Sequence, residues 1–463
     1  MNNLTQVIAA VSTPPGKGGV AIIRVSGDGA AKIADKVFSP VSGRIFSECT
    51  PRMQVYGHII SDGEIVDDVL ATRFPAPHSY TGEDTVEIGC HGGILVTRCV
   101  LEALLRAGAR AAEAGEFTRR AFINGRLSLT EAEAISDLLE AKSREQLKLS
   151  GQSARSRLSE KINSIRQSLV GLMSSIYARI DYPDEDLGDY TDDELLTSLN
   201  NIKEESVKLI STYRTGRAIS EGVRTVICGK PNVGKSSLYN LLIGEDAAIV
   251  TDIPGTTRDV LQHSIPLGRV MLRVADTAGI RERENMDTVE RIGIEKSREM
   301  IAKSELLFAL FDISREFDDE DQAIIDEISH SDSPKIALLN KSDLAARFDK
   351  EKLHGFDEII EISAKENETE AIEKLSATVN RLFTDERLTI GQDAVISSAR
   401  QHAALQRAID FMSLAIESLS LGFSQDAASS DIERALGAIS ELDGRSVSEE
   451  IVSDIFSKFC VGK

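Results

Sequence analysis

The stretch Gly229–Ser236 (GKPNVGKS) decides how the centre of this chain folds. It matches the phosphate-binding pattern GxxxxGK[ST], and it lies between the strand-like run TVIC and the helical run SSLYNLLIG. Glycines in such a loop let backbone amides surround phosphate groups at the N-terminus of a helix. Lys235 would reach the β- and γ-phosphates, and Ser236 would bind Mg²⁺. The pattern therefore predicts a nucleotide site.

Two further motifs supply contacts to magnesium and to the γ-phosphate. Asp276–Gly279 (DTAG) ends the strand-like run MLRVA, so that Asp276 can hold Mg²⁺ through water and the Gly279 amide can sense the γ-phosphate. Gly255–Asp259 (GTTRD) lies between the first two motifs. A switch threonine in such a segment closes on Mg²⁺ when the γ-phosphate is present.

The base is read by two motifs nearer the C-terminus. Asn340–Asp343 (NKSD) ends the strand-like run KIALLN, and Ser363–Lys365 (SAK) follows another such run and would back the base. Asp343 can accept hydrogen bonds from N1 and N2 of guanine. Adenine would leave this carboxylate unpaired, which rejects ATP. The five motifs in this order predict GTP binding and hydrolysis.

The residue after DTAG raises the question of how the γ-phosphate leaves. Ras-type GTPases place a glutamine there to orient water and use an arginine finger to neutralise charge. Here the position is Ile280, which can do neither. Oxygens of Asn232 and of residues 247–256 could instead hold a monovalent cation beside the phosphates.

The rest of the chain predicts a multidomain α/β protein. Strand-like runs at 20–27, 53–60, 67–74 and 84–93 and a helical run at 94–109 indicate an N-terminal α+β domain. Thr130–Glu133 (TEAE) has the pattern of a capping box and opens a helical region. From Arg224 the βαβ rhythm indicates a Ras-like parallel sheet. We expect an N-terminal domain at 1–120, an all-helical domain split into 121–220 and 385–463, and an inserted G domain at 221–384.

Composition limits the other possibilities. The chain has 463 residues, no run of about 18 apolar residues that would span a membrane, and no secretory signal pattern. Five cysteines without paired spacing favour reduced thiols in a cytoplasmic compartment. The net charge is −21, so contact with nucleic acid would need a local basic patch. Lys142–Arg166, with seven Lys or Arg and two Glu, is a candidate, although it also fits a solvated helix face.

These motifs together with VERIGI and the terminal Cys460–Lys463 (CVGK) resemble the MnmE (TrmE) family of bacterial tRNA-modification GTPases over the whole chain. The resemblance implies a K⁺-stimulated GTPase whose G domains dimerise across the nucleotides. Mg²⁺ would be held by Ser236 and Thr257, and K⁺ by Asn232, Thr251, Ile253 and Thr256. The implied GTP contacts are Asn232, Val233, Gly234, Lys235, Ser236, Ser237, Thr251, Asp252, Ile253, Pro254, Gly255, Thr256, Thr257, Asp276, Thr277, Ala278, Gly279, Asn340, Lys341, Asp343, Ser363, Ala364 and Lys365.

The resemblance also assigns two residues to catalysis. Glu290 in VERIGI matches the glutamate that orients the hydrolytic water. The stretch between DTAG and VERIG is about two residues longer than the family pattern, which leaves Glu282 and Glu284 as rivals. Cys460 would act at the modification site. Without the resemblance, Cys460 reads as a buried thiol that follows two helix-face phenylalanines.

The N-terminal domain resembles the tetrahydrofolate-binding fold of the glycine-cleavage T protein. Arg24, Glu87, Arg126 and Lys463 match the family's folate contacts, with Arg126 where Lys is more common. A carboxylate can read the donor edge of the pterin, and basic groups can meet the glutamate tail. His91 has no partner at metal-ligand spacing and reads as structural.

The family implies a homodimer that works with the FAD enzyme MnmG on the wobble uridine (U34) of certain tRNAs. It would add a carboxymethylaminomethyl or aminomethyl group at C5, with the one-carbon unit taken from methylene- or formyl-type tetrahydrofolate and GTP hydrolysis driving a conformational cycle. The basic stretch could contact tRNA or MnmG. A ribosome-assembly GTPase and a one-carbon transferase with a regulatory G domain are the alternatives.

Overall fold

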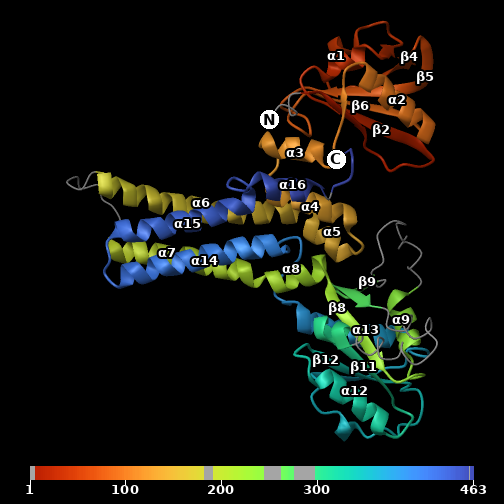
Figure 1. The fold of residues 1–463 in the computed structure, drawn as a ribbon, viewed down its shortest axis with the longest axis vertical. Coiled ribbons are helices and arrows are strands. Elements are labelled where there is room, and N and C mark those ends of the chain that lie inside the picture. Colours follow the sequence, from red (N-terminus) through yellow and green to blue (C-terminus); the bar gives the residue numbers. More distant parts are fainter. Residues whose placement is uncertain (1–5, 182–190, 245–261, 276–297, 458, 463) are drawn as a thin grey trace. The chain divides into compact units, whose positions relative to one another are not determined.

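The computed structural model describes residues 6–181, 191–244, 262–275, 298–457 and 459–462. Its contacts divide the chain into two compact units (Figure 1). The first unit comprises residues 1–139 and 436–463, and the second comprises residues 140–435. Within the described ranges, no helix combines the length and the apolar character needed to cross a membrane.

A seven-stranded sheet forms the centre of the first unit. Its strand order is β3-β4-β5-β6-β2-β1-β7, and its neighbours are antiparallel except for the β1–β7 pair. The strands are β1 (Ile8–Val11), β2 (Gly18–Ser26), β3 (Phe38–Pro40), β4 (Val55–Ser61), β5 (Glu64–Phe74), β6 (Thr85–Gly92) and β7 (Arg110–Ala111). The four strands expected from sequence are confirmed as β2, β4, β5 and β6.

Two helices cover one face of this sheet. The short 3-10 helix η1 (Phe46–Glu48) also contributes Phe46 to the core between these helices and the sheet. Helices α1 (Ala30–Asp35) and α2 (Ile94–Arg106) bury Ile33, Val100 and Leu104 against the inward residues of the strands. Alternate residues of an antiparallel strand point to opposite faces, so the other face carries the outward residues.

Three more helices complete the first unit: α3 (Glu116–Ile123), α4 (Leu129–Glu140) and α16 (Glu449–Ser457). The expected capping box at Thr130 is wrong, because Thr130 lies inside α4 and donates to the Leu442 carbonyl oxygen at 2.6 Å. The box is formed two residues earlier. Ser128 Oγ accepts from the Glu131 amide (3.2 Å), while the Ser128 amide donates to the Glu131 carboxylate (2.8 Å). Thr130 is buried, which explains why its hydroxyl finds a tertiary partner.

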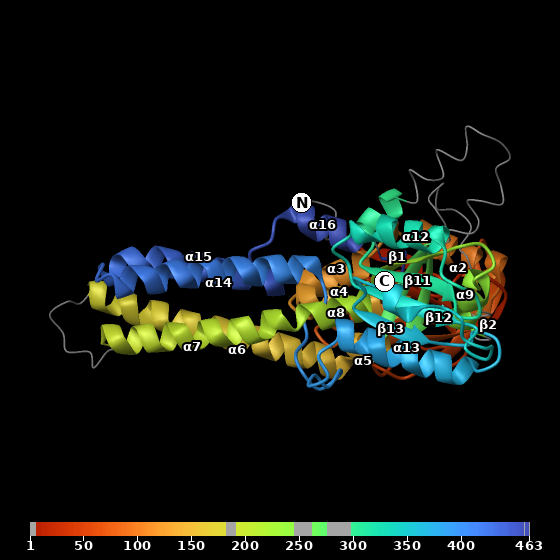
Figure 2. The same ribbon diagram turned by 90° about the horizontal axis from the view of Figure 1, so that it is seen from below.

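The second unit contains long helices whose apolar stripes pack on one another. They are α5 (Arg144–Ser150), α6 (Gln152–Asp181), α7 (Asp192–Ser211), α8 (Tyr213–Ser220), α14 (Ala399–Ser420) and α15 (Gln425–Asp443), and the residues of α15 from 436 onward belong to the first unit. Helix α7 lies along both α14 and α6 (Figures 1 and 2). Capping boxes start α7 at Thr191 and α14 at Ser398.

The same unit contains a six-stranded sheet with the order β13-β12-β11-β8-β10-β9. Neighbours are parallel except for the β9–β10 hairpin. The elements are β8 (Val223–Gly229), α9 (Lys235–Ile243), β9 (Gln262–Leu267), β10 (Val270–Ala275), β11 (Leu306–Asp312), α12 (Asp319–Ser329), β12 (Lys335–Asn340), η3 (Lys350–Lys352), β13 (Glu358–Glu361) and α13 (Glu368–Phe383).

Strand β11 is buried on both faces, as a parallel sheet between helices requires. Leu306, Phe308 and Leu310 share a core with α9 and α13. Leu307 and Phe311 share the other core, to which α12 contributes. The predicted Ras-like parallel sheet is confirmed. Ligands of such sheets bind beyond the carboxyl ends of the strands, where β8, β12 and β13 place the predicted motifs.

Candidate functional site

The phosphate loop joins β8 to α9. Gly234 caps the helix with φ of 106°, and Asn232 also has a left-handed backbone, with φ of 65°. A side chain on Gly234 would place Cβ 2.1 Å from Asn340 Nδ2, so only glycine fits this close approach. Lys235 Nζ donates to the carbonyl oxygens of Gly229 (2.8 Å) and Lys230 (2.6 Å). The loop therefore has the curvature and the ammonium group that bind phosphates.

Asn340 connects the phosphate loop with the base-binding motif. Its Nδ2 donates to the Val233 carbonyl oxygen at 2.8 Å, and its Oδ1 accepts from the Ala364 amide at 3.1 Å. The Asn340 side chain is buried, so both bonds are shielded from water. One side chain thus brings together three motifs that lie far apart in the sequence.

The remaining base-binding residues surround Asp343. Ser363 Oγ donates to Asp343 Oδ1 at 2.5 Å, which holds the carboxylate in one orientation while Asp343 remains exposed. Lys365 is exposed as well. Lys341, with φ of 66°, pairs through Nζ with Asp312 Oδ2 at 2.5 Å. Burial alone would raise the pKa of Asp312, but the hydrogen bonds from Lys341 and Ser314 lower it below its usual range.

Several predicted contacts lie outside the described residues. They are Thr251, Asp252, Ile253, Pro254, Gly255, Thr256, Thr257, Asp276, Thr277, Ala278, Gly279, Glu290 and Lys463. Asp276 directly follows β10, and β10 pairs in parallel with β8. Ser236 and Ser237 are exposed in the first turn of α9. The residues that are described fit a nucleotide, since the glycine cradle and Lys235 suit its phosphates and the Ser236 hydroxyl suits Mg²⁺.

The sequence reasoning missed one feature of the phosphate loop. The Lys230 side chain is 9% exposed, and Nζ binds Asp318 Oδ2 at 2.7 Å and Asp321 Oδ2 at 2.9 Å. Both acids lie at the start of α12. The run DDED at 318–321 signals a helix N-terminus, but no local pattern indicates that its partner is Lys230.

In the first unit, the structure brings two of the predicted folate residues together. Arg24 on β2 faces Glu87 on β6 in register, and Nη2 lies 2.8 Å from Glu87 Oε1. The Arg24 guanidinium lies 5.0 Å from the centre of the Tyr80 ring and 5.7 Å from that of Phe117. These cation–π contacts, which sequence reasoning also missed, hold the guanidinium on the face of the sheet.

The C-terminal tail joins this domain through its backbone. Val461 forms an antiparallel bridge with Ala114, and Ser12 Oγ donates to the Gly462 carbonyl oxygen at 2.9 Å. A Cβ on Gly462 would lie 2.3 Å from the Val11 carbonyl oxygen, which requires glycine there. Cys460 is exposed, so the buried-thiol interpretation is wrong.

Arg126 and His91 lie at the surface of the first unit. Arg126 is exposed, and a Cβ on Gly82 would lie 3.0 Å from its Cγ. His91 Nδ1 pairs with Asp67 Oδ1 at 2.6 Å on the sheet surface, and this hydrogen bond raises the pKa of His91. All five cysteines are free thiols.

The basic stretch Lys142–Arg166 carries less free positive charge than its sequence indicates. Lys148 pairs with Glu145, Arg157 with Glu160, and Lys161 with Glu205. These exposed pairs contribute little stability, but they reduce the local excess of positive charge. Contact with tRNA or with a protein partner stays a prediction.

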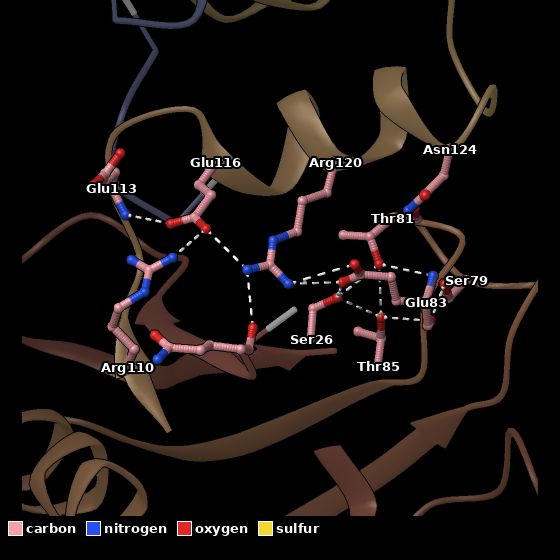
Figure 3. Close-up of polar contacts among 11 residues, drawn as sticks. Ser26, Ser79, Thr81, Glu83, Thr85, Arg110, Glu113, Glu116, Arg120 and Asn124 are labelled. Atoms are coloured by element: carbon pink, nitrogen blue, oxygen red, sulfur yellow. Dashed lines mark hydrogen bonds and ion pairs between the residues drawn. The ribbon is translucent and has the colours of Figure 1, made fainter. Parts of the chain in front are cut away.

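A buried polar network lies where α3 meets the sheet (Figure 3). Arg120, 1% exposed, binds the carboxylates of Glu116 (2.9 Å) and Glu83 (3.1 Å) and the Gln6 carbonyl oxygen (2.9 Å). Ser26, two residues after Arg24 on β2, donates to Glu83 at 3.0 Å. The network fixes α3, which carries the Phe117 ring beneath Arg24.

Comparisons with known proteins agree with this arrangement. The family profile described as "MnmE helical domain" matches residues 129–460, and "GTP-binding protein TrmE N-terminus" matches residues 7–126. The tRNA modification GTPases MnmE of Thermotoga petrophila and Finegoldia magna are each 42% identical to this chain, over 98% of it and 99% of their own length. The MnmE of Carboxydothermus hydrogenoformans is 40% identical over 99% of this chain and 100% of its own.

A solved structure of Aquifex aeolicus Era bound to GDP and aluminium fluoride is also similar in part. It is 21% identical and covers 42% of this chain and 67% of its own, with a TM-score of 0.25. That likeness is too low to support a conclusion, whereas the relatives above match from end to end. The chain belongs to the MnmE family of tRNA modification GTPases.

Proposed function

We propose that this GTP hydrolase of tRNA modification depends on K⁺ and works with the FAD enzyme MnmG at C5 of the wobble uridine. The added carboxymethylaminomethyl or aminomethyl group would take its one-carbon unit from a tetrahydrofolate. The observation that carries the GTPase part is the Asn340 side chain, which joins the phosphate loop to the guanine-binding motif. The closeness of the relatives over the full chain supports the rest. We place the protein in the cytoplasm, since its free cysteines fit a reducing compartment.

The cation proposal starts from Asn232. Asn232 is exposed in the phosphate loop and has a left-handed backbone, and its amide oxygen suits a monovalent cation. Thr251, Ile253 and Thr256 would complete the K⁺ site, and Ser236 with Thr257 would hold Mg²⁺. K⁺ would supply the positive charge that an arginine finger supplies elsewhere. Glu290 would orient the water; a Glu290→Ala variant with the full rate of GTP hydrolysis would transfer this role to Glu282 or Glu284.

The folate proposal rests on the Arg24–Glu87 pair and the docked tail. A cavity of about 670 Å³ opens beside Glu87, with Tyr56, Leu70 and Thr72 among its lining residues. This volume lies in the range of small-molecule sites. Glu87 would accept from the donor edge of the pterin, Arg24, Arg126 and Lys463 would meet anionic groups, and Cys460 would act near the site.

Coupling of GTP hydrolysis to conformational change is supported by contacts of the β9–β10 hairpin. Arg269, in its turn, donates through Nη2 to the Leu388 carbonyl oxygen at 2.7 Å and through its amide to Asn380 Oδ1 at 2.9 Å. Thr215 of α8 accepts from the Asp385 amide at 2.8 Å. The hairpin continues into the two γ-phosphate motifs at its other end, so loss of that phosphate can move the segment that leads to α14.

Reconstitution tests the proposal as a whole. The chain, MnmG, unmodified tRNA, methylene-tetrahydrofolate and GTP are combined in KCl or in NaCl at equal ionic strength, with GTP turnover and the modified uridine both measured. We expect K⁺ to raise turnover at least about tenfold, because a missing charge at the γ-phosphate costs more than about 1.4 kcal/mol. We expect modification only when every component is present.

Each arm of this experiment overturns one part. Equal turnover in both salts removes the cation mechanism. Modification without MnmG would favour a one-carbon transferase, and a complete mixture that hydrolyses GTP without modifying tRNA would favour an assembly GTPase. The homodimer is tested by sedimentation of the chain with GDP, aluminium fluoride and K⁺, where a monomer would refute it.

Glu87→Gln tests the folate site directly. We expect the affinity for 5-formyltetrahydrofolate to fall about tenfold to a hundredfold, because an amide cannot accept from the pterin as a carboxylate does. Equilibrium dialysis measures this affinity. Glu102→Gln on the exposed face of α2 is the matched control and should leave it unchanged. Equal affinities of Glu87→Gln and the parent chain would remove Glu87 from the site.

A further inference from the structure

We infer that Lys230 is a positioning residue of the GTP site, because its side chain anchors the phosphate loop to α12 while its main chain orients Lys235. The inference rests on the proposed nucleotide site and adds a residue that the GTPase motif leaves unspecified, since this position is free in GxxxxGK[ST]. Lys230 lies between the last residue of β8 and the left-handed Asn232.

The side chain of Lys230 is held almost out of water. It is 9% exposed, and its two partners differ, since the Asp318 side chain is 55% exposed and that of Asp321 only 3%. Asp321 Oδ1 is buried without a hydrogen-bond partner among the described residues. Lys230 is therefore the principal compensation for a buried carboxylate, and its ammonium group cannot leave without cost.

The anchor itself is rigid because both carboxylates also cap α12. Asp318 Oδ1 accepts from the amides of Glu320 (3.0 Å) and Asp321 (3.1 Å), and Asp321 Oδ2 accepts from the Asp318 amide (3.2 Å). Negatively charged side chains are stabilised at the positive end of a helix dipole, and the hydrogen bond from Lys230 lowers the pKa of Asp318. Lys230 thus binds a fixed pair of anions rather than two mobile side chains.

The main chain of Lys230 contacts Lys235, the residue that would bind the β- and γ-phosphates. Its carbonyl oxygen accepts from Lys235 Nζ at 2.6 Å, beside the Gly229 carbonyl oxygen at 2.8 Å. Two carbonyl oxygens in fixed positions direct the Lys235 ammonium group. A loop released from α12 would lose one of them, which displaces the group that meets the β- and γ-phosphates.

Nucleotides with different numbers of phosphates distinguish a positioning role of Lys230 from a general contribution to the stability of the fold. Dissociation constants for GTP, GDP and GMP are measured by calorimetry with Mg²⁺ on full-length Lys230→Met and Lys230→Arg. For Lys230→Met we expect GTP and GDP to bind at least about tenfold more weakly, because the charged contact to the β-phosphate is impaired. GMP, which has no β-phosphate, should bind within about twofold of the parent value, and Lys230→Arg should recover most of the loss because it keeps the charge.

Lys303→Met is the matched control, because that lysine is exposed and pairs only with Glu299 of its own helix among the described residues; it should change none of the constants. Asp318→Asn covers the case in which Lys230→Met does not fold: asparagine still caps the helix, so GTP and GDP should bind about threefold more weakly and GMP equally well. Unchanged GTP and GDP binding, or an equal loss for GMP, overturns the inference. If Lys235→Ala loses nucleotide while Lys230→Met keeps it, the positioning role fails alone; if both keep it, the nucleotide site itself is wrong.

Discussion

Lys235→Ala is expected to weaken GTP binding by at least about a hundredfold. The ammonium group meets two phosphates, and each hydrogen bond between charged groups contributes about 1.5–3 kcal/mol. In the structure, Lys235 already lies against the carbonyl oxygens of Gly229 and Lys230 at the mouth of the loop, so it does not have to be recruited from solvent. Calorimetric titration with GTP and Mg²⁺ measures the loss.

The control for this variant is Lys374→Ala on α13, where the exposed lysine pairs with Glu370. It should leave GTP affinity and thermal stability unchanged. Parent-like affinity in Lys235→Ala would refute the assignment of Gly229–Ser236 as the phosphate loop, whatever the state of the other motifs.

Arg120→Met is expected to destabilise the first unit by about 3–5 kcal/mol, because it leaves two acids without their buried cation. Glu116 is 5% exposed and depends on Arg120 and Arg110 for compensation. Chemical denaturation of the full chain measures the change as a shift in the unfolding transition of the first unit. Arg98→Met, which breaks an exposed pair on α2, should cost less than about 1 kcal/mol.

A second variant and a pH series check the cause. Glu116→Gln added to Arg120→Met should restore part of the stability, because one unpaired charge is removed. Burial alone would raise the pKa of Glu116, but hydrogen bonds from Arg110, the Glu113 amide and Arg120 lower it. A carboxyl group with a lowered pKa stabilises the fold above its unfolded pKa of about 4.3 and loses this effect as the pH falls. A free energy of unfolding that responds neither to the added Glu116→Gln substitution nor to the change of pH would contradict the role of the network.

The order of elements and the ligand class could be predicted from the sequence alone. Phosphate-loop and guanine-binding motifs are local, since each turn directly follows its own strand, and a parallel sheet brings the carboxyl ends of β8, β12 and β13 to one edge. Four of the seven strands of the first unit (β2, β4, β5 and β6) are also visible in the sequence as runs of apolar residues. Helix ends depend on single hydrogen bonds, which explains why the predicted capping box was placed two residues too late.

Contacts between distant residues were decided only by the tertiary structure. Lys230 and Asp321 lie 91 positions apart in the sequence, and they meet only because β8 and α12 pack together in the folded chain. The same holds for the Tyr80 and Phe117 rings around Arg24 and for the exposure of Cys460 in a tail that docks through its backbone. A linear pattern reports which groups a segment can offer, whereas burial and pairing belong to the surroundings that only the folded chain supplies.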